Sequence, residues 1–152
     1  MSTLGTEITK FRQWAVIRLS PDYRPGPDSH GAEWECDYPD WHDIYCAVTC
    51  FLASAHDRAL TSHETELMLY ALARDNEDEI ILETLVKFPV PALQVAEAAL
   101  TYPDSDARWQ MAVLLGRIGT LNAVALLGRF LADQEEYVRR RARFALQEAN
   151  AK

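Results

Sequence analysis

The sequence predicts an all-α protein, built as a short right-handed α-solenoid of helix pairs with an N-terminal helical cap. Three observations support this fold class. Leu and Ala are abundant whereas the 152 residues include only 6 glycines, and this composition favours helices. Apolar residues recur at the spacing of amphipathic helices. In the second half, the starts of successive helix pairs recur at roughly 29–31 residues, a period typical of helical solenoids.

The first 60 residues are expected to form a divergent cap. A first helix is predicted over residues 4–18, and it ends before Pro21 because proline cannot continue a helix. Residues 20–39 are rich in proline and glycine and are predicted to form a long loop, a kind of segment that is often functional. The next helix is predicted over residues 40–55. Its apolar stripe consists of Trp41, Ile44, Val48, Phe51 and Ala55.

Residues 61–152 are expected to form three helix pairs, which makes residues 1–152 a single domain. Thr61 and Glu64 have the spacing of a capping box at the start of the first of these helices. Prolines or N-capping residue types separate the later ones. An irregular helical bundle that obeys the same packing rules is the alternative. The predicted helices span 62–74, 76–87, 91–101, 105–118, 120–132 and 135–149, and the predicted core includes Leu114, Leu115, Ile118, Leu126, Leu127, Phe130 and Leu131.

Two segments carry a family signature. Residues 106–119 and 136–146 each begin with an acidic turn and continue through an arginine and small residues. Both resemble the second helix of a HEAT-like repeat of the PBS-lyase type, although Val is usual at Ala107 and Gly at Gln147. The resemblance implies that Arg108 and Arg139 tie the turn acids of neighbouring repeats. It indicates a fold more than a function, because such repeats serve many tasks.

The charge of the chain restricts its partners. The net charge is −8, with 19 acidic and 7 basic residues in 1–106 but 4 acidic and 8 basic residues in 107–152. Nucleic acids and anionic membranes attract clustered Lys and Arg, so an acidic chain disfavours both. A basic protein partner is favoured instead, although the acidity is equally consistent with a role in solubility alone. The run Arg139, Arg140, Arg141 and Arg143 is the exception, and it is interpreted as a solvated helix face.

The expected compartment is the cytoplasm. The N-terminus lacks the basic and apolar regions of a signal peptide, and no apolar run approaches the ~20 residues of a transmembrane helix. The three cysteines form no closed disulfide framework. His42, Cys46 and Cys50 fall on one helix face, near Asp57 and with Cys36 as a possible fourth zinc ligand. We favour buried packing of the cysteines and expect no metal or cofactor, because structural zinc sites usually show tight Cys-x2–4-Cys knuckles and cysteine is a common buried residue.

No catalytic set is predicted. Deoxyhypusine hydroxylases, which resemble this fold, bind two irons through several His-Glu pairs, and here only His63-Glu64 matches. HEAT-like DNA glycosylases hold DNA on a basic surface, whereas residues 1–106 are acidic. A relative of the phycobilin lyases remains an alternative that no particular residue supports. We therefore expect a protein that is not an enzyme.

The loop and the following helix start supply the expected partner-binding surface, because aromatic anchors surrounded by charge are typical of interfaces. Alternatively, Trp34 and Trp41 fold back to cap the helical stack. A second acidic cluster surrounds the helix predicted over 76–87. For Asp75 and Glu77, the favoured interpretation is that their carboxylates stabilise the N-terminus of this helix. The candidate residues are Glu33, Trp34, Glu35, Asp37, Tyr38, Asp40, Trp41, Asp43, Glu79 and Glu83.

These features favour a non-catalytic protein-binding module. Its most concrete form is an acidic immunity or inhibitor protein that neutralises a basic toxin or enzyme through complementary charge. In general character, though not in a motif, the chain resembles bacterial immunity proteins of the HEAT-like type. The alternative is a generic HEAT-repeat scaffold or adaptor.

Overall fold

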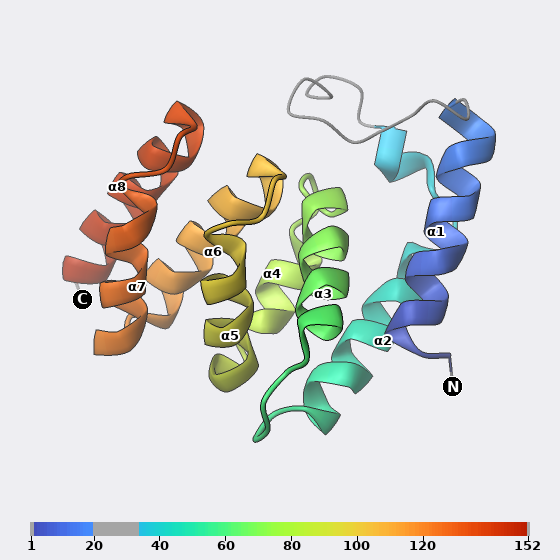
Figure 1. Cartoon of the computed structure of the whole chain (residues 1–152), viewed down its shortest axis with the longest axis horizontal. Helices are drawn as coiled ribbons and strands as arrows, with labels where there is room; N and C mark the ends of the chain where they lie inside the picture. The colour runs from blue at the N-terminus through green and yellow to red at the C-terminus, as the bar shows by residue number, and fades with distance from the viewer. Residues whose placement is uncertain (1, 20–33, 152) are drawn as a thin grey trace.

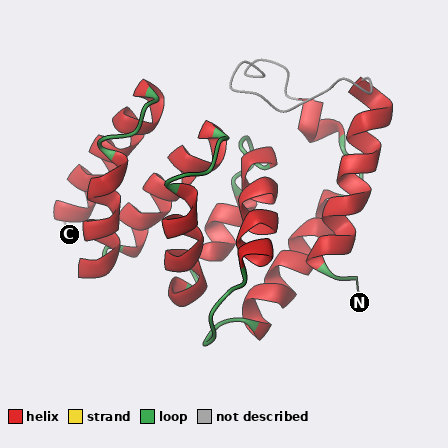
Figure 2. Ribbon diagram, in the orientation of Figure 1, coloured by secondary structure: helices red, strands yellow, loops and turns green. Residues whose placement is uncertain are grey.

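The computed structural model describes residues 2–19 and 34–151, which form helices joined by turns and contain no strand (Figure 2). The fold class is therefore all-α, as predicted. The helical elements are α1 (Leu4–Leu19), the 3-10 helix η1 (Trp34–Asp37), α2 (Trp41–Ser54), α3 (Ser62–Arg74), α4 (Ile80–Leu85), α5 (Pro89–Ala99), α6 (Ser105–Ile118), α7 (Leu121–Phe130) and α8 (Glu136–Asn150).

The helices follow one another along the longest axis of the molecule in chain order, from α1 at one end to α8 at the other (Figure 1). In this view α3, α5 and α7 form a front row, and α3 contacts α5 as α5 contacts α7. Behind them α2 contacts α4, α4 contacts α6, and α6 contacts α8. From α3 onward, each helix also contacts its chain neighbours in the other row.

Helix α6 is the most enclosed element. It contacts α3, α4, α5, α7 and α8, and every residue from Ser105 to Gly116 is buried. The Asp104 carboxylate caps its start by accepting a hydrogen bond from the Asp106 N–H at 2.9 Å. Gly119 ends it in the left-handed conformation, with φ 66°, a geometry that glycine adopts without strain.

Two observed helices begin away from their expected positions. Helix α4 covers Ile80–Leu85, not 76–87, because the chain turns over residues 75–79 and Glu79 adopts a positive φ of 55°. The Asp75 carboxylate holds this turn by accepting a hydrogen bond from Ile81 N–H at 2.7 Å. Helix α5 begins at Pro89, since proline is well suited to the first helical turn. The interval between the starts of helix pairs is therefore less regular than the sequence indicated.

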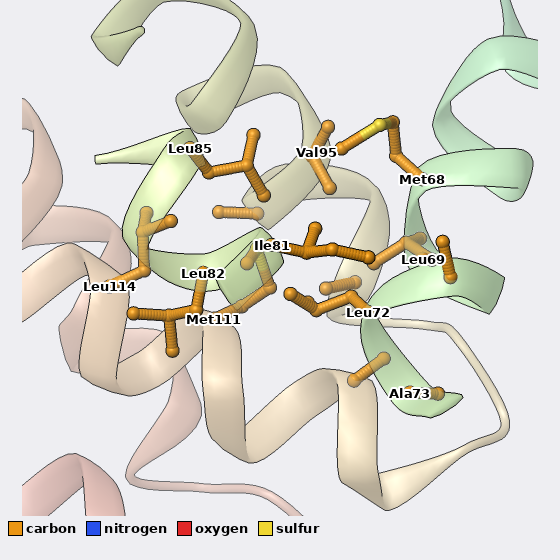
Figure 3. Packing of buried hydrophobic residues seen from close by; sticks show 14 of the residues in the cluster. Met68, Leu69, Leu72, Ala73, Ile81, Leu82, Leu85, Val95, Met111 and Leu114 are labelled. Atoms are coloured by element: carbon orange, nitrogen blue, oxygen red, sulfur yellow. The ribbon is translucent and has the colours of Figure 1, made fainter. Parts of the chain in front are cut away.

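The core runs between the two rows of helices (Figure 3). In Figure 3, side chains of α3, α4 and α6 meet one another, and Leu69, Ile81 and Met111 are fully or almost fully buried. The capping box of α3 is confirmed, with Thr61 Oγ1 accepting from Glu64 N–H and Thr61 N–H donating to Glu64 Oε2. Of the predicted core residues, Leu114, Leu115, Leu126, Leu127 and Phe130 are buried, and Ile118 and Leu131 are half-buried.

The seam between α6 and α8 is tight. A Cβ added at Gly116 would lie 2.7 Å from the Ala145 carbonyl oxygen and 2.8 Å from the Ala145 Cβ. Glycine at this position therefore allows the two helix backbones to approach closely.

Candidate partner-binding surface

The predicted surface lies at the α1 end of the molecule, where it meets a cluster of aromatic rings. Tyr38 is buried, and its ring packs edge-on against Phe11 at 4.9 Å and against Trp14 at 5.2 Å between centroids. Trp41 is half-buried, 5.4 Å from the Phe11 ring, and stacks on Tyr45 at 5.5 Å. Such aromatic pairs stabilise by about 0.5–1.5 kcal/mol each beyond their burial. These two aromatic residues therefore contribute to packing between α1, η1 and α2.

Glu35 is also buried, and it is fixed by two elements. Its Oε1 accepts a hydrogen bond from Arg74 Nη1 at 3.1 Å, and its backbone carbonyl accepts one from Trp41 Nε1 at 2.7 Å. Burial raises the pKa of the Glu35 carboxyl, and the nearby Arg74 guanidinium opposes this shift. The side chain anchors η1 to α3 and is not presented to solvent.

The exposed part of the predicted surface consists of three carboxylates, Asp37, Asp40 and Asp43. Asp40 occupies the N-cap position of α2 but makes no capping hydrogen bond through its side chain. The Glu7 carboxylate, and more weakly those of Asp43 and Asp40, raises the pKa of Lys10. Asp40 and Asp43 therefore lie close enough to Lys10 for both carboxylates to act on the same cation. Trp34 lies in η1 with its side chain outside the described part, and Glu33 lies outside the described residues altogether.

The second predicted cluster lies on the α3–α4 turn and on α4. Glu83 and Glu79 both pair with Arg117 of α6, Glu79 at 3.8 Å. Glu77 and Asp78 are exposed in the preceding turn. Of the ten predicted residues, the eight whose side chains the structure describes therefore fall into buried or half-buried anchors, exposed acids of η1 and the start of α2, and acids held by Arg117.

A ladder of polar contacts connects successive turns. The Arg74 guanidinium donates to Asp104 of the next turn, and Asn76 Nδ2 donates to Asp106 at 3.2 Å. Further along the chain, Arg108 donates to both carboxylate oxygens of Asp133, at 2.8 and 3.1 Å. The role expected for Arg108 is confirmed. The similar contact of Arg74, the last residue of α3, was not predicted from the sequence.

Arg139 departs from this pattern. Its Nη1 donates to the carbonyl oxygens of Asp133 at 2.5 Å and Gln134 at 2.9 Å, which belong to the turn before its own helix. Its Nε donates to Glu136 at 2.9 Å. The expected link from Arg139 to the turn acid of another repeat is therefore replaced by one to its own helix.

Asp75 is a buried carboxyl group at the turn between α3 and α4. It accepts hydrogen bonds from Tyr45 Oη at 2.8 Å and from Ile81 N–H at 2.7 Å. Burial raises the pKa of Asp75 to about 6, although these hydrogen bonds act in the opposite direction. Folding therefore stabilises the neutral form of Asp75 relative to the unfolded chain, and the carboxyl group becomes protonated as the pH falls through about 6.

The cysteines are not core residues, contrary to expectation. Cys36 and Cys46 are exposed and Cys50 is half-buried, and the Cys46 sulfur lies 3.5 Å from His42 Nε2. Within residues 2–19 and 34–151, no group of three or more His, Cys, Asp or Glu side chains is arranged to hold a metal ion.

A shallow hollow of about 340 Å³ separates the α5–α6 turn from the α7–α8 turn. Arg108, Asp133 and Arg129 contribute its charged groups, but Arg108 and Asp133 pair with each other and Arg129 pairs with Glu97 at 2.6 Å. These charges are therefore already compensated within the protein.

None of the described helices has the length and hydropathy required to span a membrane. Comparison of the chain with known protein families, with curated proteins and with solved structures finds no match.

Proposed function

We propose that this chain is a non-catalytic, cytoplasmic protein-binding module of the HEAT-like type, and that it acts as an acidic immunity or inhibitor protein for a basic toxin or enzyme. The observation that carries the proposal is the group of exposed carboxylates, Asp37, Asp40 and Asp43, presented by a rigid aromatic base. The negative electrostatic field of these carboxylates accelerates the encounter with a basic protein and disfavours binding of an acidic one.

The ladder of turn contacts supports the proposed solenoid. Arg74 ends α3 and Arg108 lies near the start of α6, and each donates to an acid in the turn within the next helix pair, Asp104 and Asp133 respectively. Repetition of one contact between neighbouring units is what a stack of similar helix pairs requires. The order of helices along the long axis agrees with such a stack (Figure 1).

The buried anchors explain how the surface is held in shape. Glu35 ties η1 to Arg74, and Trp41 donates to the Glu35 carbonyl, so that the chain between them has little freedom. A surface that is ordered before binding loses less conformational entropy in the complex. The carboxylates of Asp40 and Asp43 are then available at the start of α2 without a rearrangement of the fold.

The test begins with affinity purification from the native host, using the wild-type chain and the variant Asp40→Lys/Asp43→Lys as baits. Mass spectrometry identifies the proteins that only the wild type retains, and calorimetry then measures the affinity of the purified partner. We expect a basic protein whose binding weakens by about 100-fold or more in the variant, because close charge pairs contribute several kcal/mol. Higher salt should also weaken binding by screening.

The control is Glu135→Lys/Glu148→Lys, which changes the net charge equally at the other end of the molecule. It should retain binding within about threefold, a factor that corresponds to less than 1 kcal/mol. An affinity that is the same in both variants, or independent of salt, would show that these carboxylates are not the interface. If co-expression with the partner fails to reduce its toxicity or activity, the immunity role is wrong.

A further inference from the structure

The exposed face of α8 combines apolar rings with positive charge. Phe144 is 56% exposed and Tyr137 is 43% exposed. They lie seven residues apart, which places them two turns apart on the same side of the helix. The Tyr137 ring packs edge-on against Trp109 of α6, with centroids 5.8 Å apart. Large apolar groups exposed together on a helix are typical of a contact surface.

Two arginines complete this face. Arg140 lies over the Tyr137 ring at 5.1 Å, and Arg141 lies over Trp109 at 4.7 Å. Among the residues that the structure describes, no carboxylate lies within ion-pair distance of either guanidinium. Their neighbours Arg139 and Arg143 differ, because Glu136 pairs with both. Trp109, Tyr137, Arg140, Arg141 and Phe144 are called the arginine–aromatic surface below.

A surface with the opposite character lies on the α3–α4 turn. Glu77 and Asp78 are exposed, and no Lys or Arg of the described part of the chain lies within ion-pair distance of them. Ile80, which is 40% exposed, follows them directly and supplies an apolar group. Glu77, Asp78 and Ile80 are called the acidic turn below.

We propose that the arginine–aromatic surface binds the acidic turn of a second copy of this chain. The two surfaces match in sign, and each combines unneutralised charges with an exposed apolar side chain. They also belong to the two oppositely charged parts of the sequence, with net charges of −12 for residues 1–106 and +4 for 107–152. Every copy carries both surfaces. Reciprocal contacts give a closed dimer, and non-reciprocal contacts give a growing chain of copies.

A second copy fits this surface better than a nucleic acid does. A polyanion needs many basic contacts, and here two unpaired arginines stand beside the paired Arg139 and Arg143. The acidic part of the chain would repel a long polyanion. The acidic turn is compact, and it brings its own apolar contact for Tyr137 and Phe144.

Sedimentation velocity over a range of protein concentrations provides the first test. The wild-type chain is expected to form dimers or larger species, and higher salt should weaken them because it screens exposed charges. Arg140→Glu should weaken association about tenfold or more, as expected for loss of a charge pair across an interface. The matched control Arg129→Glu changes the net charge equally on α7 and should leave association unchanged. Phe144→Ser should weaken it as well, with an unchanged circular dichroism spectrum.

Mixing complementary variants provides the decisive test. Arg140→Glu/Arg141→Glu and Glu77→Lys/Asp78→Lys should each be monomeric alone, and their mixture should associate because opposite charges again face each other. A wild-type chain that is monomeric at all concentrations overturns the proposal, as does association that Arg140→Glu leaves intact. Binding of a single-stranded oligonucleotide by a monomeric chain overturns it in favour of nucleic acid. Asp40→Lys/Asp43→Lys should still self-associate, so this proposal and the one for the basic partner fail independently.

Discussion

At the scale of single residues, Asp75 shows how burial converts a common side chain into a pH-dependent contributor to stability. Its folded pKa of about 6 lies above the ordinary value of 3.8, so folding favours the protonated form. The stabilisation by protonation is complete below about pH 4 and is lost as the pH rises through about 6. A rise of about two pKa units corresponds to at most about 3 kcal/mol in the free energy of unfolding.

Asp75→Asn should remove this dependence, because the amide has no charge and can still bond to Ile81 N–H and Tyr45. The wild type loses this stabilisation as the pH rises from 4 to 7, and the variant does not. Over this range we expect the difference in free energy of unfolding, variant minus wild type, to increase by up to about 3 kcal/mol. Urea denaturation at several pH values measures it. Asp78→Asn, three residues away and exposed, is the control. A constant difference between wild type and Asp75→Asn across this range would refute the shift.

Arg74 should be the most sensitive member of the turn ladder. Arg74→Ala leaves Glu35 buried without its partner and also removes the link to Asp104. Breaking one side of a buried ion pair costs about 3–5 kcal/mol, and a loss of that size is expected in denaturant unfolding. Arg129→Ala removes an exposed pair with Glu97 and should cost less than about 1 kcal/mol. Equal losses in the two variants would mean that the ladder contributes no special stability.

The residues that the sequence predicted best are those whose partners are local. The Thr61–Glu64 capping box depends on three residues of spacing, and it forms as expected. The exposure of Cys46 was predicted wrongly, because it depends on which helices cover α2 and not on the periodicity of α2 itself. The anchor role of Glu35 depends on Arg74, 39 residues away, and local periodicity does not reveal a contact over that separation.

At the scale of helices, the sequence predicted which segments are helical better than it predicted where each helix begins and ends. Helices α3 and α6 have the expected ends, whereas α4 is shorter because Asp75 and the left-handed Glu79 form a turn where helix was expected. Local apolar periodicity does not reveal a side chain that competes with the helix for backbone N–H groups.

The α6–α8 seam gives a paired test at this scale. Gly116→Ala places a methyl group against the Ala145 backbone, so the helices must separate, with an expected loss of about 1–3 kcal/mol. Gly128→Ala on α7 meets no atom within 4 Å and should stabilise the helix by about 0.5–1 kcal/mol. Thermal unfolding monitored by circular dichroism measures both. Destabilisation by Gly128→Ala, or none by Gly116→Ala, would contradict this account of the seam.

At the scale of the whole molecule, the arrangement of helices along one axis places acidic and basic residues in different parts of the molecule. The acidic residues of η1 and α2 lie toward the end that begins with α1, those of the α3–α4 turn lie near the middle, and the arginines of α8 lie at the other end (Figure 1). The sequence indicated this asymmetry. It did not reveal which charges are neutralised internally, because pairs such as Arg117 with Glu83 join residues 34 positions apart.

The enclosure of α6 has a consequence for local opening. Because five helices cover it, its amide hydrogens can exchange with solvent only when most of the molecule opens, whereas α1 can detach with loss of fewer contacts. Hydrogen–deuterium exchange followed by mass spectrometry should therefore find the slowest amides in peptides from residues 108–116. Faster exchange there than in α1 would mean that the molecule opens from its middle outward.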